Sequence, residues 1–405
     1  DMLKTIYFFL LAVILFSSCR KVNNTCTVED YPDSPKCEWF SSFNGTEEES
    51  HGHFILSCSD GGYLQVGETG FIPNSAKLLI IKTDQNGVLL WKKEFSGGTG
   101  HNLGNSAFET DDAYLIAGSL NENSTIIKLN KMDGSLIFEK THDNGGSDAF
   151  EHLVVSQNQI IAVGYIQAED NLNTFFTEGQ GYISFMDLEG NITSQLNLEN
   201  QMAHAYRIKL LGNDFVISGL TEGANDYALI NMGSEGNINW SKTFGGSNLD
   251  HCFGMDISSD EKVLLTGHTL SGTENWDTYT MKIDEAGNQL WEVKRGNPRG
   301  FDPKYIHDEV WGIKGTNDGG CIIVAGTGDE YSTYKKRCGN DGDDSNTWHV
   351  YLVKYDGNGN VQWQKTYGDT EGGDWAGEDI DLTSDGGAIV AVDNGSFGFL
   401  KIATF

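Results

Sequence analysis

Residues 39–45 read WFSSFNG, and this stretch near the start of the chain decides the fold. It matches, position for position, a phrase that recurs as WKKEFSG at 91–97, WSKTFGG at 240–246 and WQKTYG at 363–368. Weaker copies start at Phe138 and Trp291. Such self-similarity at a spacing of about 50 residues indicates a chain built from copies of one small structural unit.

Two further phrases show what each unit contains. One is an Asp-Gly turn followed by an apolar strand that ends in glycine, as in DGGYLQVG at 60–67. The other is an apolar strand that runs into a tight turn, as in LIIKTDQNG at 79–87. Asp, Asn and Gly at these turns supply the positive φ that short hairpins need. Each unit therefore holds four short strands, which in the second unit are expected at 105–110, 114–119, 125–130 and 136–141.

Seven such units predict an all-β chain folded as a seven-bladed β-propeller, with four antiparallel strands per blade. The last unit has strands at 375–382, 388–392 and 397–403, and then the chain stops without a fourth. The phrase at 39–45 is the missing fourth strand. We therefore predict that the N-terminal strand completes the last blade, which closes the ring and leaves no free sheet edge. The propeller is expected to be one domain over residues 37–405. Tryptophans that recur in register on the fourth strands are predicted to pack blade against blade: Trp39, Trp91, Trp240, Trp291 and Trp363.

The repeated phrases resemble those of a widespread group of bacterial secreted and lipid-anchored propellers of the Bacteroidota type, with quinoprotein-like or delta-60-like repeats. The resemblance covers nearly all of residues 39–405 and implies the fold rather than a function. It does not imply a quinone-dependent dehydrogenase, because those enzymes usually have eight blades and a dedicated cofactor site.

The first 18 residues are expected to be a lipoprotein signal peptide. Lys4 precedes an apolar run at 6–16, which is shorter than the roughly 20 residues that span a bilayer. LFSSC at 15–19 resembles a lipobox, in which the cysteine is acylated, so Cys19 is the predicted lipidation site. The alternative is an ordinary signal peptide with an incidental cysteine. Residues 19–36 would form a tether, and the protein is expected at the outer membrane, on the cell surface or the periplasmic face.

The net charge limits the classes of binding partner, and the cysteines suggest how the chain is cross-linked. A formal net charge of -31 excludes nucleic acid, because phosphates demand a basic face, and it permits calcium or a cationic ligand. Cys26 and Cys37 bracket a segment that contains proline, and we predict a disulfide between them. Cys58, Cys252 and Cys321 fall inside predicted strands and are expected to be buried, whereas a partner for Cys321 or Cys338 cannot be assigned.

One face of the propeller carries the variable loops, which we call the loop face. It holds the connections from the fourth strand of one blade to the first strand of the next, and from second to third strands. Irregular loops on a rigid scaffold are where function concentrates. We therefore predict ligand binding on this face through aromatic and polar side chains: Trp276, Tyr305, His307, Asp308, Tyr331, Trp348 and Trp375.

Two candidate metal or catalytic sites follow. Alignment of the first strands, which line the channel, places His51, His204, His251 and Glu309 at one equivalent position. Together they could hold a transition metal or act as acid and base, and the alternative is that each bonds locally. The segment NDGDDSN at 340–346 suggests calcium, held by Asp341, Asp343 and Ser345, against a merely solvated acidic loop.

The sequence favours a non-catalytic binding or scaffold protein over an enzyme. The expected partner is a glycan or an envelope protein, within an outer-membrane complex. The alternative is a carbohydrate-active enzyme, a polysaccharide lyase or glycoside hydrolase, with its site at the mouth of the central channel. No nucleophile elbow, P-loop, zinc-protease motif or dinucleotide fingerprint is present.

Overall fold

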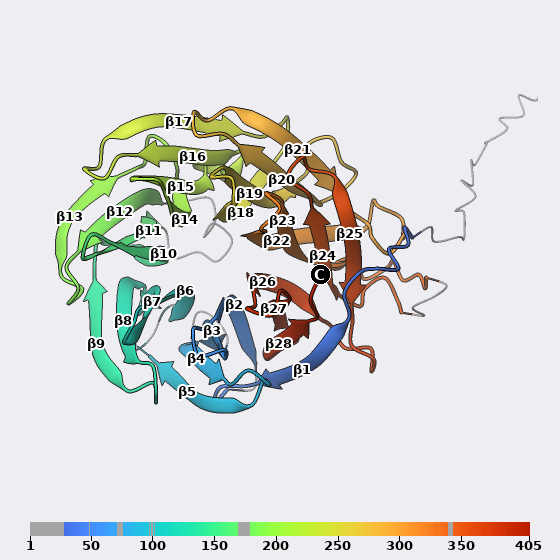
Figure 1. Cartoon of the computed structure of the whole chain (residues 1–405), viewed down its shortest axis with the longest axis horizontal. Coiled ribbons are helices and arrows are strands. Elements are labelled where there is room, and N and C mark those ends of the chain that lie inside the picture. The colour runs from blue at the N-terminus through green and yellow to red at the C-terminus, as the bar shows by residue number, and fades with distance from the viewer. Residues whose placement is uncertain are drawn as a thin grey trace, which may run out of the picture.

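The computed structural model describes residues 28–47, 49–70, 76–96, 98, 100, 102–168, 179–338 and 343–405. The predicted signal peptide, Cys19, Cys26 and Asp341 lie outside these residues. The chain is all-β and forms seven four-stranded antiparallel sheets arranged in a ring (Figure 1), which confirms the seven-bladed propeller. No helix in the described part of the chain is long and apolar enough to cross a membrane; a three-residue 3₁₀ turn occupies Glu222–Ala224.

In each blade the strands follow one another from the channel outward, except that the last blade is completed from the N-terminus. Blade 1 is β2 (Ser50–Ser57), β3 (Tyr63–Thr69), β4 (Lys77–Thr83) and β5 (Leu89–Phe95). Blade 2 is β6 (Leu103–Glu109), β7 (Ala113–Leu120), β8 (Asn123–Asn130) and β9 (Leu136–His142). Blade 3 is β10 (Ser147–Ser156), β11 (Gln159–Ala168), β12 (Gln180–Met186) and β13 (Ile192–Asn197). Blade 4 is β14 (His204–Leu211), β15 (Asp214–Leu220), β16 (Tyr227–Met232) and β17 (Ile238–Phe244).

Blade 5 is β18 (Asp250–Ile257), β19 (Val263–Thr269), β20 (Asp277–Ile283) and β21 (Gln289–Arg295). Blade 6 is β22 (Ile306–Gly315), β23 (Cys321–Asp329), β24 (His349–Tyr355) and β25 (Val361–Tyr367). Blade 7 is β26 (Ala376–Leu382), β27 (Ala388–Asp393), β28 (Phe397–Ile402) and β1 (Cys37–Phe43).

The ring closes where the sequence predicts. Strand β1 pairs antiparallel with β28, so that Trp39 lies opposite Lys401 and Ser41 opposite Phe399. In Figure 1 the blue strand β1 forms the outer edge of the sheet that contains the red strand β28. This pairing supplies hydrogen-bond partners to β28, which would otherwise be an exposed edge.

The recurrent tryptophans join neighbouring blades, as predicted. The ring of Trp91 in blade 1 lies against Gly134, which occupies the turn between β8 and β9 of blade 2 with φ +65°. Trp39, Trp240 and Trp291 meet the equivalent glycines Gly87, Gly287 and Gly359, and a Cβ at any of the four would lie 2.5–3.2 Å from the indole. Because blade 7 lacks that turn, Trp363 instead meets Phe405 near the chain end, with ring centroids 5.3 Å apart.

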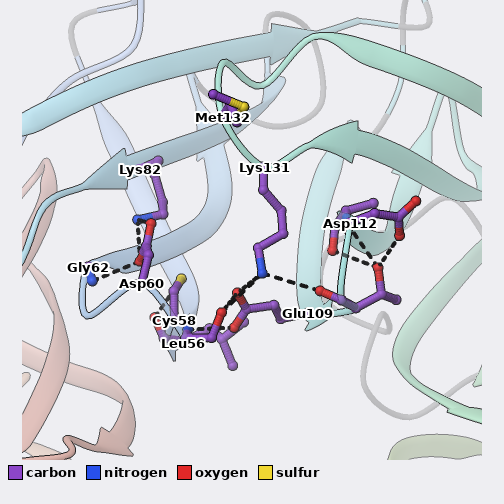
Figure 2. Close-up of polar contacts among 12 residues, drawn as sticks. Leu56, Cys58, Asp60, Gly62, Lys82, Glu109, Asp112, Lys131 and Met132 are labelled. Carbon is purple, nitrogen blue, oxygen red and sulfur yellow. Dashed lines mark hydrogen bonds and ion pairs between the residues drawn. The ribbon is translucent and has the colours of Figure 1, made fainter.

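In five blades a lysine of the third strand pairs with an aspartate of the first turn, and in four of them the lysine is buried. The fully buried Lys82 of β4 lies 2.9 Å from a carboxylate oxygen of Asp60 and donates to the carbonyl of Thr83 (Figure 2). The same carboxylate accepts from the N–H of Gly62, so one aspartate satisfies both the lysine and the tight turn. The equivalent pairs are Lys128–Asp112, Lys282–Asp260, Lys354–Asp318 and Lys401–Asp385.

The cysteines differ from expectation at one place. Cys37 has a free thiol, so the predicted Cys26–Cys37 disulfide is absent. The reason is that Cys37 is already part of β1, where it pairs with Ile402, rather than part of a small loop. Cys338 is buried and disulfide-bonded, with its partner outside the described residues. Cys58, Cys252 and Cys321 are free and buried, as predicted.

Candidate functional site

Every innermost strand carries a β-bulge at the same level of the channel. In blade 1 the register between β2 and β3 shifts between Gly52 and Phe54, which leaves His53 unpaired. A bulge re-aims the side chain of its unpaired residue and recurs next to functional sites. The seven unpaired residues, which we call the bulge ring, are His53, Asn105, Glu151, Tyr206, Phe253, Trp311 and Glu378.

The bulge ring is aromatic on one side. Tyr206, Phe253 and Trp311 come from the consecutive blades 4, 5 and 6. The ring centroids of Tyr206 and Phe253 lie 5.0 Å apart, and those of Phe253 and Trp311 lie 4.4 Å apart. Trp276 stands beside His251 and His268, with centroids at 4.8 and 4.9 Å, and extends this aromatic arc toward the loop face. Trp276 is therefore the predicted binding residue that the structure brings to the channel mouth.

The other side of the ring is acidic. Glu151 and Glu378 come from blades 3 and 7, and His53 lies between them in blade 1. Burial by itself lowers the pKa of His53, but the carboxylate of Glu68, 2.5 Å away, outweighs it and raises that pKa to about 9. Burial raises the pKa of Glu378 to about 8, and the charge of Asp393 adds to the effect. His53 is thus a paired cation, whereas Glu378 is a carboxyl without an ion-pair partner among the described residues.

Glu151 and Tyr206 are the deepest polar groups of the bulge ring. Glu151 is 5% exposed, accepts no hydrogen bond from a described residue, and has a pKa that burial raises to about 7. The charges that act on it belong to Arg207 in the next blade and to His53, two blades away. The hydroxyl of Tyr206 is buried and likewise has no partner among the described residues.

The four residues aligned from the sequence do occupy equivalent positions. His51, His204, His251 and Glu309 each lie two residues before the bulge of their own strand. They do not converge, because each is engaged locally: His51 with Asp393 at 2.7 Å, His204 against the ring of Tyr165, His251 with His268 at 3.3 Å, and Glu309 with His307 at 3.2 Å. Within the described ranges no three His, Cys, Asp or Glu side chains are placed to hold a metal ion.

Two predicted binding residues are buried instead. Asp308 is fully buried and accepts a hydrogen bond from the N–H of Asn297 at 2.6 Å, so it fastens the loop before β22. Trp375 is 9% exposed and stacks on Phe40 of β1 with centroids 4.1 Å apart. Asp308 therefore has no exposed surface, and the ring of Trp375 is largely covered by Phe40.

The remaining predicted binding residues lie over blade 6. Tyr305 packs against Tyr331 and Tyr334, and His307 approaches Tyr331 with centroids 6.1 Å apart. Trp348 covers Gly326 and Gly328 of β23, where a Cβ would lie within 3.0 Å of its indole. These side chains border the mouth on the side of Glu309 rather than lining it.

The calcium hypothesis loses one of its ligands. Ser345 is fully buried, and its hydroxyl donates to Asp329 at 2.5 Å. Asp343 accepts from His349 at 2.9 Å, and Asp341 lies outside the described residues. The hydroxyl of Ser345 is therefore enclosed within the protein and bonded to Asp329.

Below the bulge ring the channel narrows. The space at the axis shrinks to a cavity of about 20 Å³, whose lining includes Phe54, His152, Asp379 and the cations Arg207, Lys209 and Lys314. A group that enters from the loop face therefore meets the bulge ring and goes no deeper. The sequence alignment stopped two residues short of this ring, although the bulged residue stands at a constant offset from His51 and its equivalents.

Comparisons with known proteins bear on the fold. The sequence matches no known protein family, and no curated protein matches it. Among solved structures, the WD40 propeller domain of Doa1 has a TM-score of 0.56 at 12% identity, over 93% of this chain and 98% of that one. A catalytically inactive virginiamycin B lyase from Staphylococcus aureus, with quinupristin, gives 0.56 at 14% identity, over 90% and 99%. YCF48 bound to D1 peptide gives 0.52 at 11% identity, over 92% and 100%. Similar structures are mostly binding or scaffold propellers, with some enzymes, and at these identities they show the fold alone.

Proposed function

We propose that this protein is a non-catalytic binding protein that holds a glycan or a protein partner at the mouth of its channel, on the loop face. The observation that carries the proposal is the bulge ring, in which an arc of aromatic side chains faces two carboxyls above a closed channel. Concave sites with aromatic walls and a few polar groups are typical of ligand binding. Propellers of similar fold are bound to D1 peptide in the YCF48 structure and are seen with quinupristin in the lyase structure.

The test compares two single variants on a glycan array and in pull-downs from outer-membrane extracts. Trp311→Ala removes one ring of the aromatic arc, whereas Met132→Ala changes a 90% exposed residue in the turn between β8 and β9, on the opposite face (Figure 2). We expect the wild-type protein to give a glycan or protein signal. Trp311→Ala should lower this signal at least tenfold, and Met132→Ala should leave it unchanged. A signal that both variants retain would place the binding surface elsewhere and overturn the proposal.

The proposal includes export and attachment to the outer membrane through acylated Cys19. It rests on the apolar leader and the lipobox-like LFSSC at 15–19. Metabolic labelling with a fatty acid should mark the wild-type protein and leave Cys19→Ser unlabelled. Equal labelling of both would remove the anchor from the proposal.

A second candidate, a carbohydrate-active enzyme, is favoured by one pair of carboxyls. Burial raises the pKa of Glu309, but the hydrogen bond from His307 outweighs it, so Glu309 is ionised while Glu378 in the next blade has a pKa of about 8. One ionised and one protonated carboxyl at the same mouth can act as base and acid. Turnover of an acidic polysaccharide that Glu378→Gln abolishes would favour this candidate over simple binding.

A further inference from the structure

We infer that the group held at the channel mouth is an organic cation, the ammonium or guanidinium tip of a lysine or arginine side chain from a protein partner. This inference rests on the proposed binding role of the mouth and adds the chemistry of the bound group.

The first support is an imbalance of charge at the mouth. His51 and His53 already have anionic partners, since His51 lies 2.7 Å from Asp393 and His53 lies 2.5 Å from Glu68. Glu151 and Glu378 have neither an ion-pair partner nor a hydrogen bond among the described residues. A buried carboxyl without a bonded partner is costly to ionise in a site shielded from water, and a bound cation relieves that cost.

Arg207 does not fill this role. It follows Tyr206 on β14 and acts on Glu151 electrostatically, but its guanidinium donates to the carbonyl of Tyr206 at 3.0 Å. Its charge is also shared with Asp379, whose carboxylate accepts from the N–H of Ile55. Glu151 therefore remains a 95%-buried carboxyl without a bonded partner among the described residues, aimed into the channel by its bulge.

The second support is the aromatic arc that faces these carboxyls. The faces of tyrosine, phenylalanine and tryptophan rings attract cations through the ring quadrupole. Tyr206, Phe253 and Trp311 form a continuous arc over blades 4 to 6, with Glu151 in the blade before it and Glu378 in the blade after it. Aromatic rings combined with acidic groups form the kind of cage that recognises ammonium groups.

The depth of the bulge ring favours an amino-acid side chain over a sugar as the bound group. Glu151, Tyr206 and Phe253 are 5%, 6% and 3% exposed, so a slim unbranched stem reaches them more readily than a six-membered sugar ring. The channel closes just below them, which fits a chain that ends there. The net charge of -31 steers a basic partner toward this protein from a distance.

The experiment measures binding of capped single amino acids by calorimetry and by the fluorescence of Trp311 and Trp276. The probes are N-acetyl-lysine methylamide, its arginine and norleucine counterparts, glucosamine and glucose. We expect lysine and arginine to bind at least about tenfold more tightly than norleucine, glucosamine or glucose. Raising the salt concentration should weaken the binding of the lysine and arginine probes and leave the binding of norleucine unchanged.

Variants then locate the site. Glu151→Gln should lower the lysine affinity about tenfold or more, and Trp311→Leu should do the same through the aromatic arc. Glu139→Gln, which removes the same charge from an exposed position on the outer strand β9, should leave it unchanged. Circular dichroism and melting temperature establish that each variant is folded.

The outcomes separate this inference from the proposed function. If norleucine or glucose binds as tightly as lysine, and Trp311→Leu lowers that affinity, the inference that the bound group is a cation is overturned. The proposed binding role would then still hold. A preference for glucosamine would replace the protein side chain by an amino sugar and overturn the inference as stated. If no glycan or protein signal depends on Trp311 either, the proposed function itself fails.

Discussion

The indole of Trp291 on β21 lies against Gly359, which belongs to the turn between β24 and β25 of the next blade. A Cβ at Gly359 would lie 2.8 Å from Cδ2 of the indole, and the indole N–H donates to the carbonyl of Gly357 at 3.0 Å. Among the described strands no ladder connects one blade to the next, so contacts of this kind hold the outer strands of neighbouring sheets together. The tryptophan and the turn glycine are therefore two halves of one inter-blade joint.

This joint predicts a large effect for Gly359→Ala. The residue has φ +82°, which alone costs an alanine about 1 kcal/mol, and the new methyl group would overlap the indole at a further cost of roughly 1–3 kcal/mol. Gly372→Ala is the matched control, because Gly372 also has φ +82° but a methyl group there would meet no described atom within 4 Å. Urea unfolding should show Gly359→Ala as the less stable variant. Equal losses in the two variants would mean that the indole moves aside without cost.

The lysine–aspartate pairs predict a second difference in stability between two variants. Lys354 is 6% exposed and lies 2.8 Å from Asp318, so Asp318→Ala leaves a buried ammonium with only a carbonyl partner. We expect a loss of about 2 kcal/mol, below the 3–5 kcal/mol of fully buried pairs because Asp318 is 41% exposed. Asp112→Ala is the control, since Asp112 is 75% exposed and 3.9 Å from Lys128; it should cost less than about 0.5 kcal/mol. Equal losses at Asp318 and Asp112 in chemical denaturation would contradict the role of burial.

Acid should weaken the same pair. Burial raises the pKa of Asp318, but the hydrogen bond from Lys354 outweighs it and brings that pKa to about 2, below the ordinary value of 3.8. The contribution of the pair is therefore complete above pH 3.8 and disappears as the pH falls toward 2. The difference in unfolding free energy between wild type and Asp318→Ala should shrink over that range.

The fold was predictable because every blade repeats the residues that build it. Trp39 could be paired with the segment around Lys401 because its phrase is a copy of the phrase at Trp91, and the same phrase always forms a fourth strand. The interior of the channel was not predictable, because Asn105, Glu151 and Phe253 share a position but no chemistry, and a search for similar residues passes over them. Only the bulge, a backbone feature, makes them equivalent.

Loop position misled the prediction at Asp308 and Trp375 for a different reason. Asp308 belongs to a set with Asp148 and Asp250, each of which accepts an N–H from the loop that precedes its strand. Each of these aspartates lies one residue before the position shared by His51, His204, His251 and Glu309. The alignment of the first strands therefore already contained them. Trp375 is buried by Phe40, which lies more than 300 residues away in the sequence, and no local pattern reports such a contact.

Ring closure predicts the effect of removing β1. A chain that starts at Asn44 lacks the strand that covers β28, loses the stack of Phe40 on Trp375 and loses the hydrogen bond from Tyr367 to the carbonyl of Pro35. It should aggregate through the exposed edge or melt at least about 10 °C below a chain that starts at Val28. Both chains lack the same first 27 residues, so the difference reports on 28–43 alone. Size-exclusion chromatography should then show a monomer again when a peptide of residues 28–43 is added; identical behaviour of the two chains would contradict closure by β1.

The acidic side of the mouth predicts that stability falls in alkali. Burial and the charge of Asp393 raise the pKa of Glu378 from 4.5 to about 8, so between these values the folded protein holds a proton that the unfolded chain releases. Stability from this group is therefore complete below pH 4.5 and is lost as the pH rises through 8. Because the side chain is only partly buried, we expect a loss of about 2 kcal/mol rather than the full linkage value.

Glu378→Gln tests that sign directly, because glutamine is neutral at every pH. The variant should match wild type at pH 4.5 and be about 2 kcal/mol more stable at pH 9, as measured by urea unfolding. Glu139→Gln, on the solvent-exposed outer strand β9, should differ from wild type by the same small amount at both values. If Glu378→Gln has no advantage at pH 9, the carboxyl is already ionised at neutral pH, and the repulsion from Asp393 must be balanced by His51 and His53 instead.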